Sequence, residues 1–165
     1  MLNKNIHKRL FETTICIFML LLLVGCQTVP SGLNARQVEV LKKNGFELTD
    51  QGWLLNLSGK VLFGFDDVTT GPEEKAIITR IADSLLEVDI SQLRLEGHTD
   101  SIGAQSYNDT LSLNRAKRVS ELFVEAGFNP DNISAQGLGS RYPVASNDTL
   151  KGRQENRRVS IIVQP

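Results

Sequence analysis

The chain has 165 residues, and its 18 lysines and arginines nearly balance its 19 aspartates and glutamates, which leaves a formal net charge of −1. Binding to nucleic acid needs a concentrated basic surface, so this composition argues against a nucleic-acid partner. The length is that of one ordinary domain with a short additional segment.

Residues 1–25 are predicted to be a secretory signal peptide. Lys4, Lys8 and Arg9 precede an apolar run over residues 15–24, an order that is typical of such signals. The run is too short for a transmembrane helix, which needs about 20 apolar residues. The alternative is that residues 15–24 stay attached to the mature chain as an uncleaved anchor.

The signal ends in the sequence Leu-Val-Gly-Cys at residues 23–26, which resembles the lipobox of bacterial lipoproteins. This resemblance implies cleavage before Cys26 and acylation of its thiol. Because Gln27 follows instead of an aspartate, it also implies transport to the outer membrane, where two or three acyl chains make a stable anchor. Cys16 lies in the removed segment, so the mature chain keeps no thiol for a disulfide or a metal site.

The mature chain is predicted to begin with a tether and a short helix. Residues 26–33 contain Pro, Ser and Gly without any periodicity, which favours a lipidated tether. Asn34 can cap a helix whose third position is Gln37, and Gly45 is placed to end that helix.

A partly alternating apolar pattern follows over residues 46–57 and predicts a half-buried strand or hairpin, with its turn at residues 50–52. We therefore treat residues 34–58 as a helix and hairpin segment. It precedes the main domain, which we place at residues 59–165.

The main domain is predicted to alternate strands and helices. Apolar residues recur at strand or helix spacing in six segments, namely a strand at 61–65, a helix at 73–88, a strand at 93–98, a helix at 107–126 and strands at 133–137 and 159–163. This βαβαββ order predicts an α+β fold in which helices pack on one mixed sheet.

The candidate site lies where the strand at 93–98 ends. Asp100 leaves its carboxyl end, which is where open α/β sheets place ligands. Asn108, Leu111 and Arg115 have helical spacing, so they share one face of the next helix and span about 10 Å. Asp100 and Arg115 can thus flank one pocket and bind the ammonium and the carboxylate of a zwitterion. The alternative is that the two side chains only pair with each other.

The motifs around these residues resemble the OmpA C-terminal domain over about residues 59–164. The matching positions are Gly97-His98-Thr99-Asp100, Gly103, Asn108, Leu111-Ser112, Arg115-Ala116, Val119, Gly137-Leu138-Gly139, Pro143, Asn147, Gly152-Arg153 and Asn156-Arg157-Arg158-Val159. The resemblance implies non-covalent binding of peptidoglycan through meso-diaminopimelate of the stem peptide. Asp100 would bind its ammonium and Arg115 its carboxylate.

The same resemblance implies supporting residues around that pair. Thr99, Asn108 and Leu111 would line the site, and Asp66 and Arg157 match further family positions near it. For Asp66 and Arg157 the alternative is an ordinary structural ion pair. Because side chains alternate between the two faces of a strand, Arg158 has the opposite parity to Arg157 and is expected to be solvated.

Catalysis, metal binding and cofactor binding are not predicted. His98 is the only histidine after the signal segment, so no histidine cluster is available for a metal. His98 and Asp100 lie on one short segment, and the Gly-x-Ser-x-Gly motif of many hydrolases does not occur. A cell-wall hydrolase remains the enzymatic alternative.

The stretch over residues 33–60 and the residues just after it are similar to the amino-terminal part of YfiB lipoproteins, and the likeness departs after Gly64. The matching positions are Leu33, Gln37, Val40-Leu41, Asn44-Gly45-Phe46-Glu47-Leu48, Gly52-Trp53 and Lys60-Val61-Leu62-Phe63-Gly64. It implies that the chain sequesters a YfiR-like periplasmic repressor and so activates a membrane diguanylate cyclase in cyclic di-GMP signalling. Leu41, Phe46 and Trp53 are the candidate partner-binding residues, because apolar anchors outside the four-strand core suit an interface. Two alternatives stay open: a structural anchor of the peptidoglycan-associated lipoprotein type, or simple packing of these residues against the domain.

Overall fold

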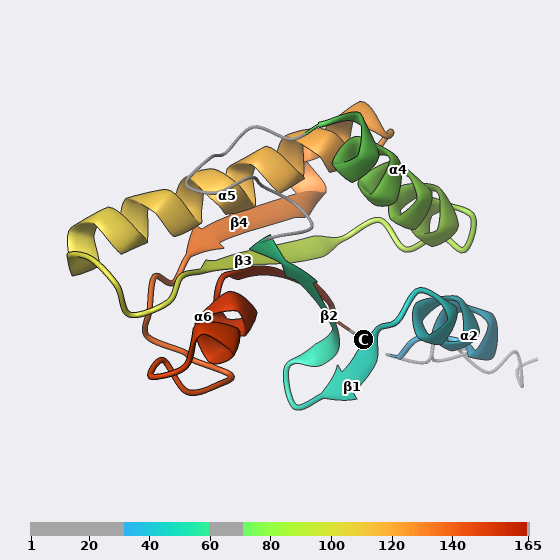
Figure 1. Cartoon of the computed structure of the whole chain (residues 1–165). Helices are drawn as coiled ribbons and strands as arrows, with labels where there is room; N and C mark the ends of the chain where they lie inside the picture. The colour runs from blue at the N-terminus through green and yellow to red at the C-terminus, as the bar shows by residue number, and fades with distance from the viewer. Residues whose placement is uncertain (1–31, 60–70, 165) are drawn as a thin grey trace, which may run out of the picture. The chain divides into compact units, whose positions relative to one another are not determined.

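The computed structural model describes residues 32–59 and 71–164 (Figure 1). The signal peptide, Cys26, the strand expected at 61–65 and Asp66 lie outside these ranges. Within the described ranges, no helix is both long enough and apolar enough to cross a bilayer. The elements in chain order are α2 (Ala35–Lys43), β1 (Glu47–Thr49), β2 (Gly52–Ser58), α4 (Pro72–Leu86), β3 (Leu93–His98), α5 (Gln105–Glu125), the 3-10 turn η1 (Pro130–Asn132), β4 (Ile133–Gly137), α6 (Leu150–Asn156) and β5 (Arg158–Val163).

The strands form one mixed sheet in the order β1-β2-β5-β3-β4. Only the β3–β4 pair among them is parallel, and the other pairs are antiparallel. Helices α4 and α5 lie on one side of the sheet and α6 lies on the other (Figure 1), whereas the β1–β2 hairpin forms one edge of the sheet. The predicted α+β fold with helices on one mixed sheet is confirmed.

The hydrophobic core lies between the sheet and the helices α4 and α5. Alternate residues of the central strands face it, so Leu95, Val159 and Ile161 are fully buried. The backbone of α5 approaches β3 closely at Gly97, where a Cβ atom would overlap the carbonyl oxygen of Ser112. This contact fixes the position of α5 against the end of β3.

Helix α2 begins as the sequence predicts. Asn34 Oδ1 accepts the backbone N–H of Gln37 at 2.9 Å, and Gln37 Oε1 accepts that of Asn34 at 2.9 Å. This reciprocal capping satisfies two donors that a helix start leaves free. Gln37 Nε2 also donates to the carbonyl of Val88 at 2.9 Å, which ties α2 to the chain just after α4. Gly45, with φ of +84°, follows the end of the helix.

The expectation that Phe46 and Trp53 lie outside the core is wrong. Leu41, Phe46 and Trp53 are 0%, 3% and 7% exposed and belong to the hydrophobic core. The cause is the pairing of β2 with β5 along its whole length, from Trp53 with Val163 to Ser58 with Arg158. This pairing satisfies the backbone groups of β5 that would otherwise lie unpaired at an edge.

The close approach of α5 and β3 predicts that Gly97→Ala is destabilising. Its Cβ would meet backbone that cannot move without displacing the helix, so we expect the free energy of unfolding to fall by about 3 kcal/mol. Urea denaturation measures this change. Gly32→Ala is the matched control, because no atom lies within 4 Å of the added Cβ. Equal midpoints for the two variants would contradict the packing described.

Candidate functional site

The loop after β3 is held in place by the chain around Gly139. The backbone N–H of Thr99 donates to the carbonyl of Gly139 at 2.9 Å, and that of Gly139 donates to Ser112 Oγ at 3.0 Å. Ser112 is fully buried on α5. The end of β3, the loop after β4 and helix α5 are therefore connected where Thr99 and Asp100 leave the sheet.

Asp100 presents a carboxylate that is 8% exposed and bonded on both oxygens. Oδ1 accepts the backbone N–H of Ile102 at 3.0 Å, and Oδ2 pairs with Arg157 Nη1 at 2.5 Å. The described ion pair of Asp100 is thus with Arg157. A carboxylate has about four lone-pair sites, so Asp100 keeps capacity for a ligand.

Helix α5 lines the site with the face that the sequence predicts. Asn108 and Arg115 are buried, at 2% and 5% exposed, and Leu111 between them is partly buried. Asn108 Nδ2 donates to the carbonyl of Ile102 at 3.1 Å, which fixes the loop that carries Asp100. Thr99, Asp100, Asn108 and Arg157 are therefore joined around one loop. Arg115 lies about one helical turn beyond Ser112 on the same buried face.

Asn147 and Asn156 have a structural role that sequence reasoning missed, although both occur in the family pattern. Asn156 is fully buried, and its Oδ1 accepts the backbone N–H groups of Val144 and Ala145 at 2.8 and 3.0 Å. Its Nδ2 donates to Asn147 Oδ1 at 2.9 Å, and the same oxygen accepts the N–H of Ser101 at 3.2 Å. This relay connects the end of α6 to the loop of Asp100.

Arg158 is buried, which corrects the expectation that it is solvated. It is 7% exposed, and it lies opposite His98 in the β3–β5 pairing, on the sheet face that α5 does not cover. Arg158 lies on the face predicted from strand alternation, but the chain between β4 and α6 covers its side chain. The carbonyl of Tyr142 in that segment accepts from Arg158 Nη2 at 3.2 Å.

His98 is neutral in this surrounding. Burial, and after it the positive charge of Arg158, lower the pKa of His98 from 6.5 to about 3. Within the described ranges, no three His, Cys, Asp or Glu side chains gather as a metal site.

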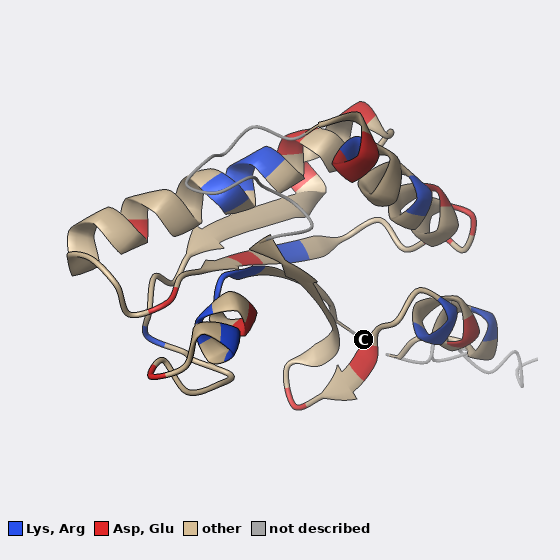
Figure 2. Ribbon diagram, in the orientation of Figure 1, with Lys and Arg blue, Asp and Glu red and all other residues tan. Residues whose placement is uncertain are grey.

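Acidic and basic residues occur together on the helices α2, α4 and α6, so none of these three helices carries charges of one sign alone (Figure 2).

Comparisons with known proteins identify the family and the fold. The sequence profile of the OmpA family matches residues 62–157. Outer-membrane lipoprotein YfiB of Pseudomonas aeruginosa is 47% identical over 165 residues, which cover 99% of this chain and 98% of the relative. The peptidoglycan-binding protein ArfA of Mycobacterium bovis is 40% identical over 105 residues, which cover 64% of this chain and 32% of ArfA. Among solved structures, the cell wall anchor of the T6SS from Pseudomonas aeruginosa is similar with a TM-score of 0.63 and 28% identity, over 79% of this chain and 95% of that one.

The lowered pKa of His98 predicts that acid destabilises the fold. Between pH 6.5 and about 3 the unfolded chain binds a proton at His98 that the folded chain does not. Stability that is present above pH 6.5 is therefore lost as the pH falls, at roughly 1 kcal/mol per pH unit. Chemical denaturation from pH 7 to pH 4 measures the slope. His98→Gln should show a shallower slope, and parallel slopes would refute the assignment.

Proposed function

Because the chain belongs to the OmpA family, we propose that it binds peptidoglycan non-covalently, through the site around Asp100. The observation that carries this proposal is the Asp100 carboxylate at the end of β3, held by Ile102 and Arg157 beside the face of α5 that bears Asn108 and Arg115. The names of two relatives, a peptidoglycan-binding protein and a cell wall anchor, support it.

The ligand chemistry follows from the two charges of the site. The free end of meso-diaminopimelate carries an ammonium and a carboxylate on one carbon. Asp100 binds the ammonium, and the guanidinium of Arg115 binds the carboxylate with a bidentate geometry. Thr99 supports this role, because its Oγ1 is buried without a hydrogen-bond partner among the described contacts. Leu111 lines the site beside Asn108 in this proposal.

The chain is an outer-membrane lipoprotein, as its full-length relative is named. In our proposal the anchor is lipid on Cys26, which brings the domain to the periplasmic side of the outer membrane within reach of the wall. The domain binds the wall without catalysing a reaction on it.

The N-terminal segment supports a second, finer role as a regulator. The likeness to YfiB extends over 99% of this chain, which includes the segment before the OmpA-like domain. In this proposal the segment captures a YfiR-like repressor, which activates a membrane diguanylate cyclase. The alternative is that the chain serves only as a structural wall anchor.

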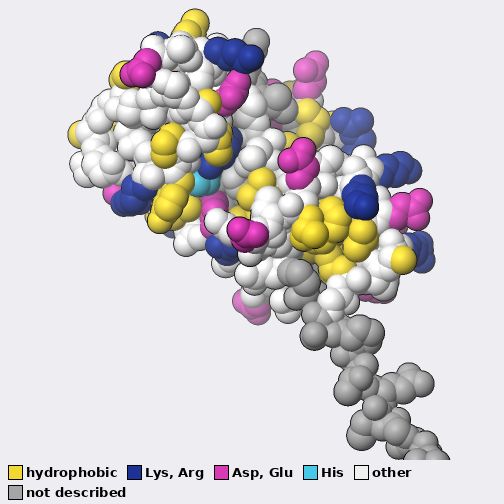
Figure 3. All heavy atoms as spheres, turned by 90° about the horizontal axis from the view of Figure 1, so that it is seen from below, with side chains coloured by type: hydrophobic (Ala, Val, Ile, Leu, Met, Phe, Trp, Pro, Cys, Tyr) yellow, Lys and Arg dark blue, Asp and Glu magenta, His cyan; other side chains and the backbone are white. Residues whose placement is uncertain are grey.

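The structure adds a requirement to this regulatory role. Leu41, Phe46 and Trp53 are buried, so they contact a partner only when the segment moves off the domain. Leu48, in the same segment, is already 66% exposed. Apolar side chains gather over α2 and the β1–β2 hairpin on the face seen in Figure 3. In this proposal a partner first contacts this apolar surface, and then Leu41, Phe46 and Trp53 once the segment has moved off the domain.

The wall-binding role predicts that Asp100→Asn weakens the binding of diaminopimelate-type peptidoglycan at least about tenfold, because a charge-assisted hydrogen bond contributes about 1.5–3 kcal/mol. Sedimentation of the chain with purified sacculi measures the affinity. The control is Asp109→Asn, which removes another carboxylate that pairs with an arginine, Arg141, at 2.7 Å. The proposal fails if both variants bind as tightly as the original chain.

The regulatory role predicts opposite effects of two substitutions on binding to the YfiR-like protein of the same bacterium. Gln37→Ala removes the bond to Val88 and half of the helix cap, so it loosens the segment and should strengthen binding several-fold. Trp53→Ala removes an anchor and should weaken it. Surface plasmon resonance with purified proteins measures both. No binding by any variant would leave the plain wall anchor as the function.

A further inference from the structure

The face of the sheet that α5 does not cover carries a row of polar side chains. Arg94, Glu96 and His98 alternate on β3 with residues of the core, and Arg158 lies directly opposite His98 on β5. Both charge signs are visible along β3 in Figure 2. Glu96, His98 and Arg158 are 6%, 2% and 7% exposed, which is unusual for such residues in the middle of a sheet.

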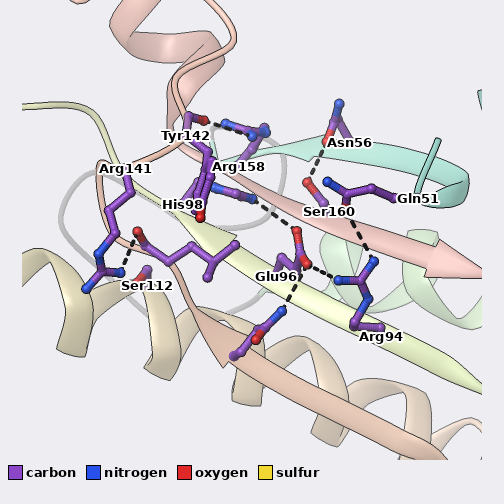
Figure 4. Close-up of polar contacts among 12 residues, drawn as sticks. Gln51, Asn56, Arg94, Glu96, His98, Ser112, Arg141, Tyr142, Arg158 and Ser160 are labelled. Carbon is purple, nitrogen blue, oxygen red and sulfur yellow. Dashed lines mark hydrogen bonds and ion pairs between the residues drawn. The ribbon is translucent and has the colours of Figure 1, made fainter. Parts of the chain in front are cut away.

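At the Glu96 end of this row, the carboxylate has hydrogen-bond partners. Glu96 Oε1 accepts Arg94 Nη1 at 2.6 Å and Gln136 Nε2 at 2.9 Å (Figure 4). Arg94 Nη2 reaches Gln51 Oε1 in the β1–β2 turn at 3.2 Å. The carboxylate of Glu96 is therefore engaged by Arg94, and its nearest approach to His98 Nε2 is 3.8 Å.

At the other end of the row, His98 and Arg158 have buried polar atoms that lack hydrogen-bond partners among the described contacts. Both ring nitrogens of His98 and Nε of Arg158 are buried without a hydrogen-bond partner among the described contacts. The remaining donors of Arg158 reach only neutral carbonyls, at 3.4 Å to Asn156 and 3.2 Å to Tyr142. Figure 4 shows the side chains of His98 and Arg158 next to each other at the end of β3.

An uncompensated cation explains this arrangement. A guanidinium stays charged in proteins, and a buried charge is costly unless an opposite charge pairs with it. Arg94 and Arg158 face one carboxylate, Glu96, while His98 is neutral. The low pKa of His98, caused by burial and by Arg158, agrees with an excess of one positive charge. A single negative charge would balance the cluster.

We propose that His98 and Arg158 form a second binding site, on the sheet face opposite α5, for the carboxylate of a small monoanion. One carboxylate oxygen accepts from Nε of Arg158 and the other from the N–H of His98. The planar guanidinium matches a carboxylate, and a monoanion neutralises the cluster where a dianion would leave an excess. The site is distinct from the Asp100 site and does not depend on peptidoglycan binding.

Tyr142 borders this site. The Tyr142 side chain is 60% exposed, and its carbonyl holds Arg158 through a long hydrogen bond. An anionic oxygen is a stronger acceptor than a neutral carbonyl, so a carboxylate binds favourably at the unpaired Nε of Arg158 while the Tyr142 carbonyl keeps its contact with Nη2. In Figure 3, histidine and basic side chains are visible between apolar ones on this face.

The test uses the imidazole of His98 as a probe. In the lipidated chain, solubilised in detergent after the predicted removal of residues 1–25 with His7, His98 is the only histidine. Its ¹⁵N resonances are followed by NMR during titration with acetate, and separately with chloride and phosphate at constant ionic strength. We expect a saturable shift with acetate that exceeds those with the other two anions. The absence of any shift would mean that water alone fills the site, and equal shifts with all three anions would mean that it does not select a carboxylate; either result would overturn the proposal.

Two variants decide whether Arg158 holds the anion. Arg158→Gln should weaken acetate binding at least tenfold, whereas Lys151→Gln, which removes an 89% exposed cation from α6, should leave it within twofold. If Arg158→Gln does not fold, Arg158→Lys keeps the charge but loses the Nε donor beside His98, and should still weaken binding several-fold. Unchanged affinity in the folded Arg158 variant overturns the proposal. A muropeptide that shifts His98 as acetate does would identify the wall as the source of the carboxylate, whereas a response to acetate alone would point to a free metabolite.

Discussion

The ion pair between Asp100 and Arg157 joins the loop after β3 to the residue that precedes β5. The backbone of Arg157 is itself held, because its carbonyl accepts the N–H of Gly59 and its N–H donates to Arg153 at the end of α6. The Asp100 carboxylate is thus oriented by residues from three parts of the chain. The binding of an ammonium that we propose at Asp100 depends on this support, since the ligand needs a carboxylate that is charged and correctly oriented.

The two faces of the sheet differ in the side chains that they carry. The face toward α4 and α5 holds the apolar core, and close contact at Gly97 sets the position of α5 and hence of Asn108 and Arg115. The other face holds a row of polar side chains that includes the buried Glu96, His98 and Arg158 and the partly exposed Arg94. Strand β3 contributes to both, and the loop that follows it carries Asp100.

The sequence predicted α2, α4 and α5 well, because periodic apolar patterns and capping residues indicate which helix positions are buried and where a helix begins. Asn34 and Gln37 marked the start of α2, and the face of α5 with Asn108, Leu111 and Arg115 could be read from spacing alone. The N-terminal hairpin was predicted as a local element, but not that β2 joins the sheet next to β5. Strand pairing is non-local, so no pattern within residues 46–57 could show its neighbour.

Helix α6 and the pairing partner of Asp100 were missed for related reasons. Leu150–Asn156 is short, contains Gly152 and has no apolar stripe, so it gave no helical signal. Arg157 and Arg158 are adjacent, and only the covering loop with Tyr142 decides that Arg158 is buried. The resemblance placed Arg157 near the site, whereas the bond to Asp100 Oδ2 came from the fold.

The central claim is that one site binds an ammonium and a carboxylate on the same carbon. The most direct measurement is calorimetric titration of the chain with two muropeptides that differ only at the third residue of the stem, meso-diaminopimelate or lysine. Lysine keeps the side-chain ammonium and lacks the carboxylate that Arg115 would bind. We expect the lysine peptide to bind at least about tenfold more weakly, since a charge-assisted hydrogen bond is lost. Equal affinities would contradict the account.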